Sequence, residues 1–212
     1  HQGYIEPHNA VAFSRSDGTL ELHCSSQGHF GVRNEVSQIL GIPISTIRVV
    51  PAEIGGGFGG KLTNYVAIPA VLLAQKSGRP VKMAMDRAET LLATGPAPAS
   101  VIHARLGATN DGLLTAAHLE MYYEAGAFPG SSVGGGANCG FAPYRLENFR
   151  VDGYDVLVNK PKSQAYRAPG APQAAFAVES MIDELSADLG VDPVEFRLRN
   201  ASTEGDIRPN GT

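Results

Sequence analysis

The chain has 212 residues, of which 43% are hydrophobic and 18% are charged, and its formal net charge is −4. This length can bury the core of one large or two small domains, and with no basic run the composition argues against nucleic-acid binding. The longest apolar stretch, residues 65–73, is too short to cross a bilayer, so we expect no membrane segment.

In the first half of the chain, segments whose apolar residues alternate as in strands are interspersed with segments whose apolar residues are spaced as in helices. Strands are predicted at residues 10–14, 20–26, 47–50 and 81–86. Helices are predicted at residues 31–40 and 62–76. A glycine-rich loop separates the third strand from the second helix. This order predicts an α+β fold with helices on one face of a sheet.

Residues 92–100 have the composition of a linker, and we place a domain boundary near residue 95. Strands again precede helices in the second half. We predict a hairpin over 101–123, a surface loop over 126–140, further strand within 144–158, and helices over 172–189 and 194–200. We therefore expect two consecutive mixed sheet-plus-helix subdomains, residues 1–95 and 96–212.

The loop over residues 54–61 reads Ile-Gly-Gly-Gly-Phe-Gly-Gly-Lys. Glycine allows positive φ and close approach of a ligand, and consecutive N–H groups beside a helix N-terminus form a donor surface for anionic oxygens. The spacing is not the dinucleotide fingerprint, and Leu62 stands where a P-loop carries Ser or Thr. A tight strand-to-helix turn that binds no ligand is the alternative interpretation of the loop by itself.

A second motif, residues 164–173, reads Gln-Ala-Tyr-Arg-Ala-Pro-Gly-Ala-Pro-Gln. It places Arg167 between the end of a strand and the start of a helix. The planar guanidinium has five donors and suits oxyanions and phosphates. A surface arginine on a turn is the alternative interpretation, but two anion-suited loops in a chain with few charges favour a shared ligand.

In this order the two motifs resemble those of the xanthine oxidase and aldehyde oxidase family, the molybdenum hydroxylases. Residues 55–61 are similar to that family's G-G-G-F-G-G-K loop, and residues 165–173 to its A-[FY]-R-x-x-G-x-P-Q loop. Four shorter stretches also match the family's motifs: residues 1–8, 25–27, 143–145 and 192–200. The resemblance covers essentially the whole chain.

The resemblance implies part of the molybdopterin-binding large subunit of an enzyme that hydroxylates an aldehyde or an N-heterocycle with oxygen derived from water. Molybdopterin, as such or as the cytosine dinucleotide, would carry the molybdenum. Electrons would pass to [2Fe–2S] clusters and FAD on partner chains or domains. The remaining molybdopterin-binding half, the iron–sulfur and FAD subunits and a small-molecule substrate are the implied partners.

Carried over residue by residue, the resemblance also implies a site. Phe58 and Arg167 would be catalytic, Phe58 against the molybdenum centre and Arg167 against the metal centre and pterin. The cofactor-binding residues would be Gly56, Gly57, Phe58, Gly59, Gly60, Gln27, Tyr166, Arg167 and Ala168. The substrate pocket would include Leu62, Gly135 and Pro169.

Several parts of such an enzyme are not found in this sequence. The family's general base is a glutamate in the other half of the large subunit, whereas Glu179 and Glu184 are expected to be solvated on a helix's polar face. Cys24 and Cys139 are too few to hold iron–sulfur clusters, and their wide spacing is typical of a reduced, cytoplasmic protein. The chain opens in mid-motif without Met, so we expect a split subunit or an excised part.

Two substrates are disfavoured by the same comparison. Purine-oxidising members carry a glutamate where Leu62 stands and an arginine near Gly135, and the carbon-monoxide-oxidising branch carries a cysteine where Ala168 stands. Two other functions stay open: a non-catalytic binding or assembly module, and a nucleotide-binding domain that uses residues 55–60. The histidine spacings match no zinc pattern.

Overall fold

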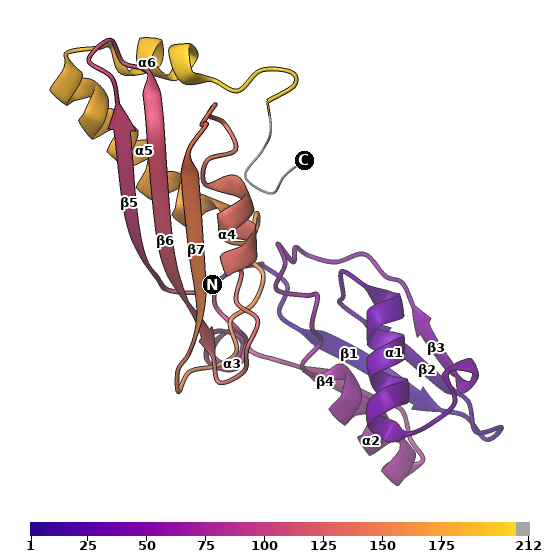
Figure 1. The fold of residues 1–212 in the computed structure, drawn as a ribbon. Coiled ribbons are helices and arrows are strands. Elements are labelled where there is room, and N and C mark those ends of the chain that lie inside the picture. Colours follow the sequence, from indigo (N-terminus) through magenta and orange to yellow (C-terminus); the bar gives the residue numbers. More distant parts are fainter. Residues whose placement is uncertain (207–212) are drawn as a thin grey trace. The chain divides into compact units, whose positions relative to one another are not determined.

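The computed structural model describes residues 1–206, which form two compact units. The first unit is His1–Pro96 together with the short segment Gln164–Arg167. The second is Ala97–Ser163 together with the described residues from Ala168 to 206. Figure 1 shows both units, each a sheet with helices, and we describe each separately.

The first unit contains a four-stranded sheet with the order β3-β2-β1-β4. The strands are β1 (Asn9–Ser14), β2 (Leu20–Cys24), β3 (Ile47–Val50) and β4 (Val81–Ala84). Only the β2–β3 pair is parallel. Leu20, Leu22 and Cys24 alternate with less buried residues along β2, so one face of the sheet supplies the core. The four predicted strands are confirmed.

Helices cover this apolar face. The covering helices are α1 (His29–Leu40) and α2 (Ala67–Ser77). The unit also contains the short 3₁₀ turn η1 (Ile44–Thr46) and the helix α3 (Arg87–Ala93). Val32 and Val36 of α1 and Ala70 and Ala74 of α2 join one core cluster with the strand residues. α1 ends where predicted, at Gly41, which adopts the left-handed conformation.

The start of α2 differs from the prediction. The helix begins at Ala67 because the Asn64 side-chain oxygen accepts hydrogen bonds from the N–H groups of Val66 and Ala67, at 3.1 and 2.7 Å. The glycine loop therefore leads into a turn and not onto a helix N-terminus. The expectation that a helix dipole assists anion binding at this loop was wrong.

The helix α3 was not predicted: it occupies residues 87–91, to which no element was assigned from the sequence, and the first two residues of the predicted linker over 92–100. Asp86 accepts a hydrogen bond from the Glu89 N–H, and the Glu89 side chain accepts one from the Asp86 N–H. This reciprocal capping box stabilises a short helix. The Asp-x-x-Glu spacing was the signal that could have predicted it.

The second unit contains a three-stranded sheet, β5 (Ser100–Ala108), β6 (Leu114–Gly126) and β7 (Phe149–Leu157), in that order (Figure 1). β5 and β6 form the predicted hairpin, with Gly112 at φ 81° in the turn. β7 runs parallel to β6. The helix α5 (Ala171–Leu189), close to the predicted range, packs on the sheet through Ala174, Val178 and Ile182.

Two findings in this unit correct the sequence interpretation. The segment predicted as a surface loop contains the helix α4 (Val133–Cys139). Glu179 is not simply solvated: it accepts hydrogen bonds from the Tyr144 hydroxyl at 2.6 Å and from Arg197 Nε at 2.7 Å. Arg197 belongs to α6 (Pro193–Asn200), which Asp192 caps as predicted. Glu179 is thus a structural link, while Glu184 is exposed.

Candidate functional site

Two motifs that lie far apart in the sequence meet inside the first unit. The Arg167 N–H donates a hydrogen bond to the Phe58 carbonyl at 2.9 Å. The Gln2 side-chain amide donates to the Ala165 carbonyl at 2.8 Å. The arginine segment is therefore held beside the glycine loop by backbone-directed hydrogen bonds, which do not depend on the side chains of Phe58 or Arg167.

Each motif contains a residue with unusual backbone geometry. Phe58 has φ 52° and Ala168 has φ 59°, and within residues 1–206 no other residue except glycine has positive φ. Such conformations cost about 1–3 kcal/mol each, and they gather at ligand sites where the surroundings fix the backbone. Phe58 belongs to the first unit, whereas Ala168 belongs to the second.

Close packing explains why two of the loop positions are glycine. A Cβ atom at Gly57 would lie 2.5 Å from Gln27 Oε1, and one at Gly59 would lie 2.6 Å from the Ala165 carbonyl oxygen. Gly59 also has φ +94°, which side-chain-bearing residues rarely adopt. The glycines thus allow the loop to approach both Gln27 and the arginine segment.

Gln27 supports the loop through its side-chain oxygen. Gln27 Oε1 accepts hydrogen bonds from the N–H groups of Gly59 and Lys61, at 2.9 and 3.1 Å. The Gln27 residue is exposed, and within residues 1–206 its amide nitrogen has no hydrogen-bond partner. It therefore offers a further donor beside the loop, in the region where the sequence predicted a supporting contact.

Several other donors at this site are uncommitted. Within the described part of the chain, no partner is found for the backbone N–H groups of Gly56, Gly57 and Phe58 or for the Arg167 guanidinium. Gly57 is itself buried, and buried N–H groups are almost always paired. Donors arranged in this way suit an anionic group with several oxygen atoms.

The aromatic and apolar side chains of the site are accessible. Phe58 is 46% exposed, Tyr166 is 42% exposed and Leu62 is 52% exposed. Large apolar side chains usually lose most of their exposure in a folded protein, so each of these three side chains is available to contact a bound molecule.

Lys61 does not take part as a ligand donor. Its side chain is fully buried, and Nζ lies 2.7 Å from Glu6 Oε2. A P-loop lysine must reach the phosphates of a nucleotide. The nucleotide-binding alternative thus lacks its cation as well as its Ser or Thr. Sequence reasoning assigned no role to Glu6, although both residues lie in stretches that match family motifs.

The remaining predicted site residues belong to the second unit. Gly135, in α4, lies so close to Pro169 that a Cβ atom would be 2.3 Å from the Pro169 carbonyl oxygen. The Tyr123 hydroxyl donates to the Gly170 carbonyl at 2.9 Å, and burial raises the pKa of Tyr123 to about 12. The turn at 168–170 is therefore fixed against α4 and β6.

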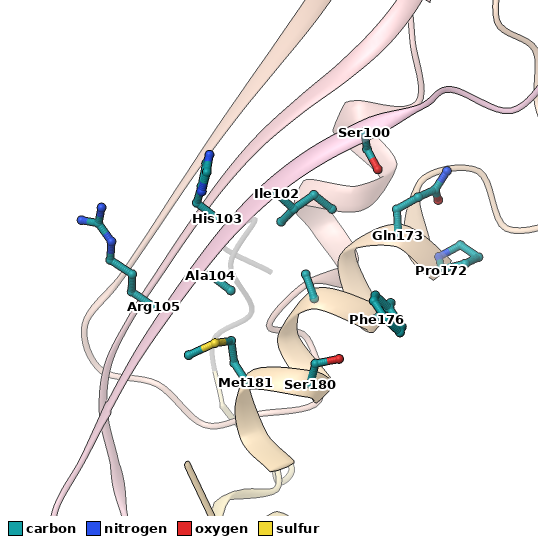
Figure 2. Close-up of a pocket in the computed structure, with 11 residues that line it drawn as sticks. Ser100, Ile102, His103, Ala104, Arg105, Pro172, Gln173, Phe176, Ser180 and Met181 are labelled. Atoms are coloured by element: carbon teal, nitrogen blue, oxygen red, sulfur yellow. The ribbon is translucent and has the colours of Figure 1, made fainter. Parts of the chain in front are cut away.

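A groove of about 770 Å³ opens between β5 and α5 of the same unit (Figure 2). It is lined by Ile102, Arg105, Gln173, Phe176, Ser180 and Met181, among others. It shares only Pro172 and Gln173 with the arginine motif. The groove is therefore a separate feature from the donor-rich loops.

Among residues 1–206, no group of three or more His, Cys, Asp and Glu side chains is arranged to hold a metal ion. The helices of the same residues include none with the length and apolar character of a bilayer span.

Comparisons with known proteins give a consistent result. The family model described as the molybdopterin cofactor-binding domain matches residues 1–201. The nicotinate dehydrogenase large molybdopterin subunit of Eubacterium barkeri is 35% identical over 206 residues, which are 95% of this chain and 48% of that protein. The xanthine dehydrogenase molybdenum-binding subunit of Escherichia coli O157:H7 is 37% identical over 210 residues, which are 97% of this chain and 28% of that protein.

Solved structures resemble the chain as well. The aldehyde oxidoreductase of Desulfovibrio gigas matches with a TM-score of 0.89 and 29% identity, over 98% of this chain and 23% of that one. The quinoline 2-oxidoreductase of Pseudomonas putida 86 matches with a TM-score of 0.90 and 28% identity, over 97% of this chain and 27% of that one. The chain thus spans about half or less of the length of these relatives.

Proposed function

The chain belongs to the molybdopterin cofactor-binding domain family, and from this premise we propose that its glycine loop and arginine segment bind the molybdenum-bearing pterin of a molybdenum hydroxylase. The observation that carries the proposal is the set of uncommitted donors: the N–H groups of Gly56, Gly57 and Phe58, and the guanidinium of Arg167, whose backbone N–H bonds to the Phe58 carbonyl. Gln27 and Tyr166 complete the predicted contacts from the first unit, and Gly59 and Gly60 shape the loop.

The residues present fit such a group. Molybdopterin and its molybdenum centre carry anionic oxygens, and a guanidinium fork with several N–H donors satisfies oxygens of this kind. The buried Gly57 N–H has no partner within residues 1–206, so binding of an acceptor would complete its hydrogen bonding. Ala168 follows Arg167 directly, and its positive φ redirects the chain at that point.

When bound, the cofactor supplies a two-electron oxidation in which the substrate gains an oxygen derived from water. The chain's own residues orient the reaction and stabilise charge. Donors held in place before the reaction lower the energy of negative charge that develops in a water-poor site, and this is commonly the largest electrostatic contribution to catalysis. The exposed Phe58 ring would exclude water and position a planar substrate. The general base, a glutamate, would come from the other part of the large subunit.

The electron acceptors would lie on partner chains or domains. A [2Fe–2S] cluster takes four protein ligands, typically cysteines, and this chain has only two cysteines. Both Cys24 and Cys139 are free, which supports a reducing, cytoplasmic location for the assembled enzyme.

An aldehyde or a weakly polar N-heterocycle is the proposed substrate. Leu62 presents an apolar side chain where purine-oxidising members have a carboxylate. Gly135 cannot be replaced by a larger residue without displacing the Pro169 carbonyl. A polar ring that finds no polar side chain at these two positions would leave its own groups unpaired, at about 1–3 kcal/mol each.

The test is an arginine substitution in the assembled enzyme. Arg167→Lys keeps the charge but loses the fork, so we expect turnover with an artificial electron acceptor, or molybdenum content, to fall tenfold or more. Arg79→Lys, at an exposed position of the same unit, is the matched control and should behave as wild type. Wild-type rate and metal content in Arg167→Lys would show that Arg167 is only a turn residue.

A further inference from the structure

Both ends of the glycine loop converge on one carboxylate. Glu6 Oε2 accepts a hydrogen bond from the Gly55 N–H at 2.7 Å and another from Lys61 Nζ at 2.7 Å. The Glu6 N–H also donates to the Gly55 carbonyl at 3.2 Å. Gly55 opens the loop and Lys61 closes it, so Glu6 joins the two ends.

The ion pair is buried on the lysine side. The Lys61 side chain has no exposed surface, and its Nζ lies 5.0 Å from the centroid of the Tyr4 ring, whereas the Glu6 side chain is 31% exposed. Burial by itself would favour the neutral acid, but hydrogen bonds from Lys61 and Gly55 hold the pKa of Glu6 below its usual value. A buried ammonium group is costly unless it is paired, so the Lys61 ammonium depends on Glu6 as its partner.

The loop needs this restraint. Five of the eight residues in 54–61 are glycine, and glycine loses more conformational freedom on ordering than any other residue. Phe58 also has to be kept at φ 52°. The hydrogen bonds that Glu6 accepts from Gly55 and Lys61, and those that Gln27 accepts from Gly59 and Lys61, fix the loop at several points. None of them uses the N–H groups of residues 56–58.

We propose that Glu6 and Lys61 are positioning residues that clamp the glycine loop, so that the N–H groups of Gly56, Gly57 and Phe58 are held in place for an oxyanion ligand. Neither residue touches the ligand. The inference rests on the proposed function for the identity of that ligand, whereas the clamp itself is a property of this chain alone.

The first test measures the loop without cofactor. Amide hydrogen exchange of this chain, followed by NMR, is compared in wild type, Lys61→Met and the double variant Glu6→Gln/Lys61→Met. In both variants we expect the amides at positions 55, 59 and 61 to exchange at least tenfold faster than in wild type. The amides of β1 serve as the internal reference for each protein. Lys160→Met is the matched control, because Lys160 Nζ lies 2.6 Å from Glu124 Oε2 in an exposed pair of the second unit.

The double variant separates positioning from stability. Removing both charges together avoids an unpaired buried charge, so we expect near-wild-type urea unfolding. Hydrogen exchange at the loop amides should nevertheless remain fast, because the bridge between the loop ends is lost. Loop exchange equal to wild type in both clamp variants would overturn the inference.

The second test measures cofactor retention in the assembled enzyme as molybdenum remaining after dialysis. We expect the double variant to lose molybdenum at least tenfold faster than the Lys160→Met control. If retention is unchanged while Arg167→Lys loses the metal, the clamp does not serve the ligand and the inference is wrong. If neither variant loses metal while loop exchange is fast, the clamp stands and the proposed cofactor site fails.

Discussion

The stability of the first unit should depend on pH through one buried histidine. His8 has no exposed surface and lies between the rings of Tyr4 and Tyr65, with centroid distances of 5.5 and 5.1 Å. Neither ring nitrogen makes a side-chain hydrogen bond within residues 1–206. Two causes lower the pKa of His8 from 6.5 to about 4: burial, which is the larger, and the positive charge of Lys61.

The sign and size of the effect follow from this pKa. Because the folded-state value lies below the unfolded value, the stabilisation is present above pH 6.5 and is lost as the pH falls toward 4. Between pH 7 and pH 5, wild type should lose about 2 kcal/mol of unfolding free energy through His8. His8→Phe retains an aromatic ring but cannot bind a proton, so this loss should be absent from the variant.

The assay is urea unfolding of this chain at both pH values, followed by circular dichroism. Comparing wild type with His8→Phe cancels the contributions of the carboxylates that both proteins share. His103→Phe, which replaces an exposed histidine, should keep the wild-type pH dependence. Equal losses in wild type and His8→Phe would refute the assignment of this pH dependence to His8.

Three further predictions concern the site. This chain expressed alone should fold but hold no molybdenum, because its donors cover only part of a buried anionic cofactor; near-stoichiometric metal by elemental analysis would contradict this. Gly59→Ala should lower the unfolding free energy by about 2 kcal/mol or more, because its Cβ would meet the Ala165 carbonyl, whereas Gly28→Ala meets nothing within 4 Å and should cost far less. The assembled enzyme should have a kcat/KM for xanthine about a hundredfold below that for an aromatic aldehyde, because Leu62 and Gly135 offer no polar side chain; equal values in a steady-state assay would be evidence against this substrate preference.

The sequence by itself determined the elements whose signals are local. Alternating residues and an Asn-Asp-Gly turn predicted the β5–β6 hairpin, apolar spacing with a following glycine predicted α1, and apolar spacing predicted α5. These patterns work because the backbone periods of 2 and 3.6 residues fix which side chains share a face. The glycine loop and the arginine segment were also recognisable in the sequence, and the family that they indicated is confirmed.

Tertiary structure alone decided the features that depend on distant partners. The Asn64 side chain that caps α2 is held by a distant partner, because its amide nitrogen donates a hydrogen bond to the Ser25 carbonyl at 3.2 Å. The three glycines of 134–136 lie in a helix although glycine disfavours helices. α4 packs closely against the turn at 168–170, where no larger residue than glycine fits at position 135. Local propensity cannot predict such choices, because the compensating contacts come from other parts of the chain.

The arrangement of the site likewise depended on the fold. No local pattern shows that Gln164–Arg167 packs with the first unit, where the Arg167 N–H bonds to the Phe58 carbonyl. Nor does one show that Lys61 is buried against Glu6 and is thereby removed from the ligand-binding donors. A charged side chain near an anion-suited loop looks available in the sequence, and only the packing around it decides whether its charge is already paired.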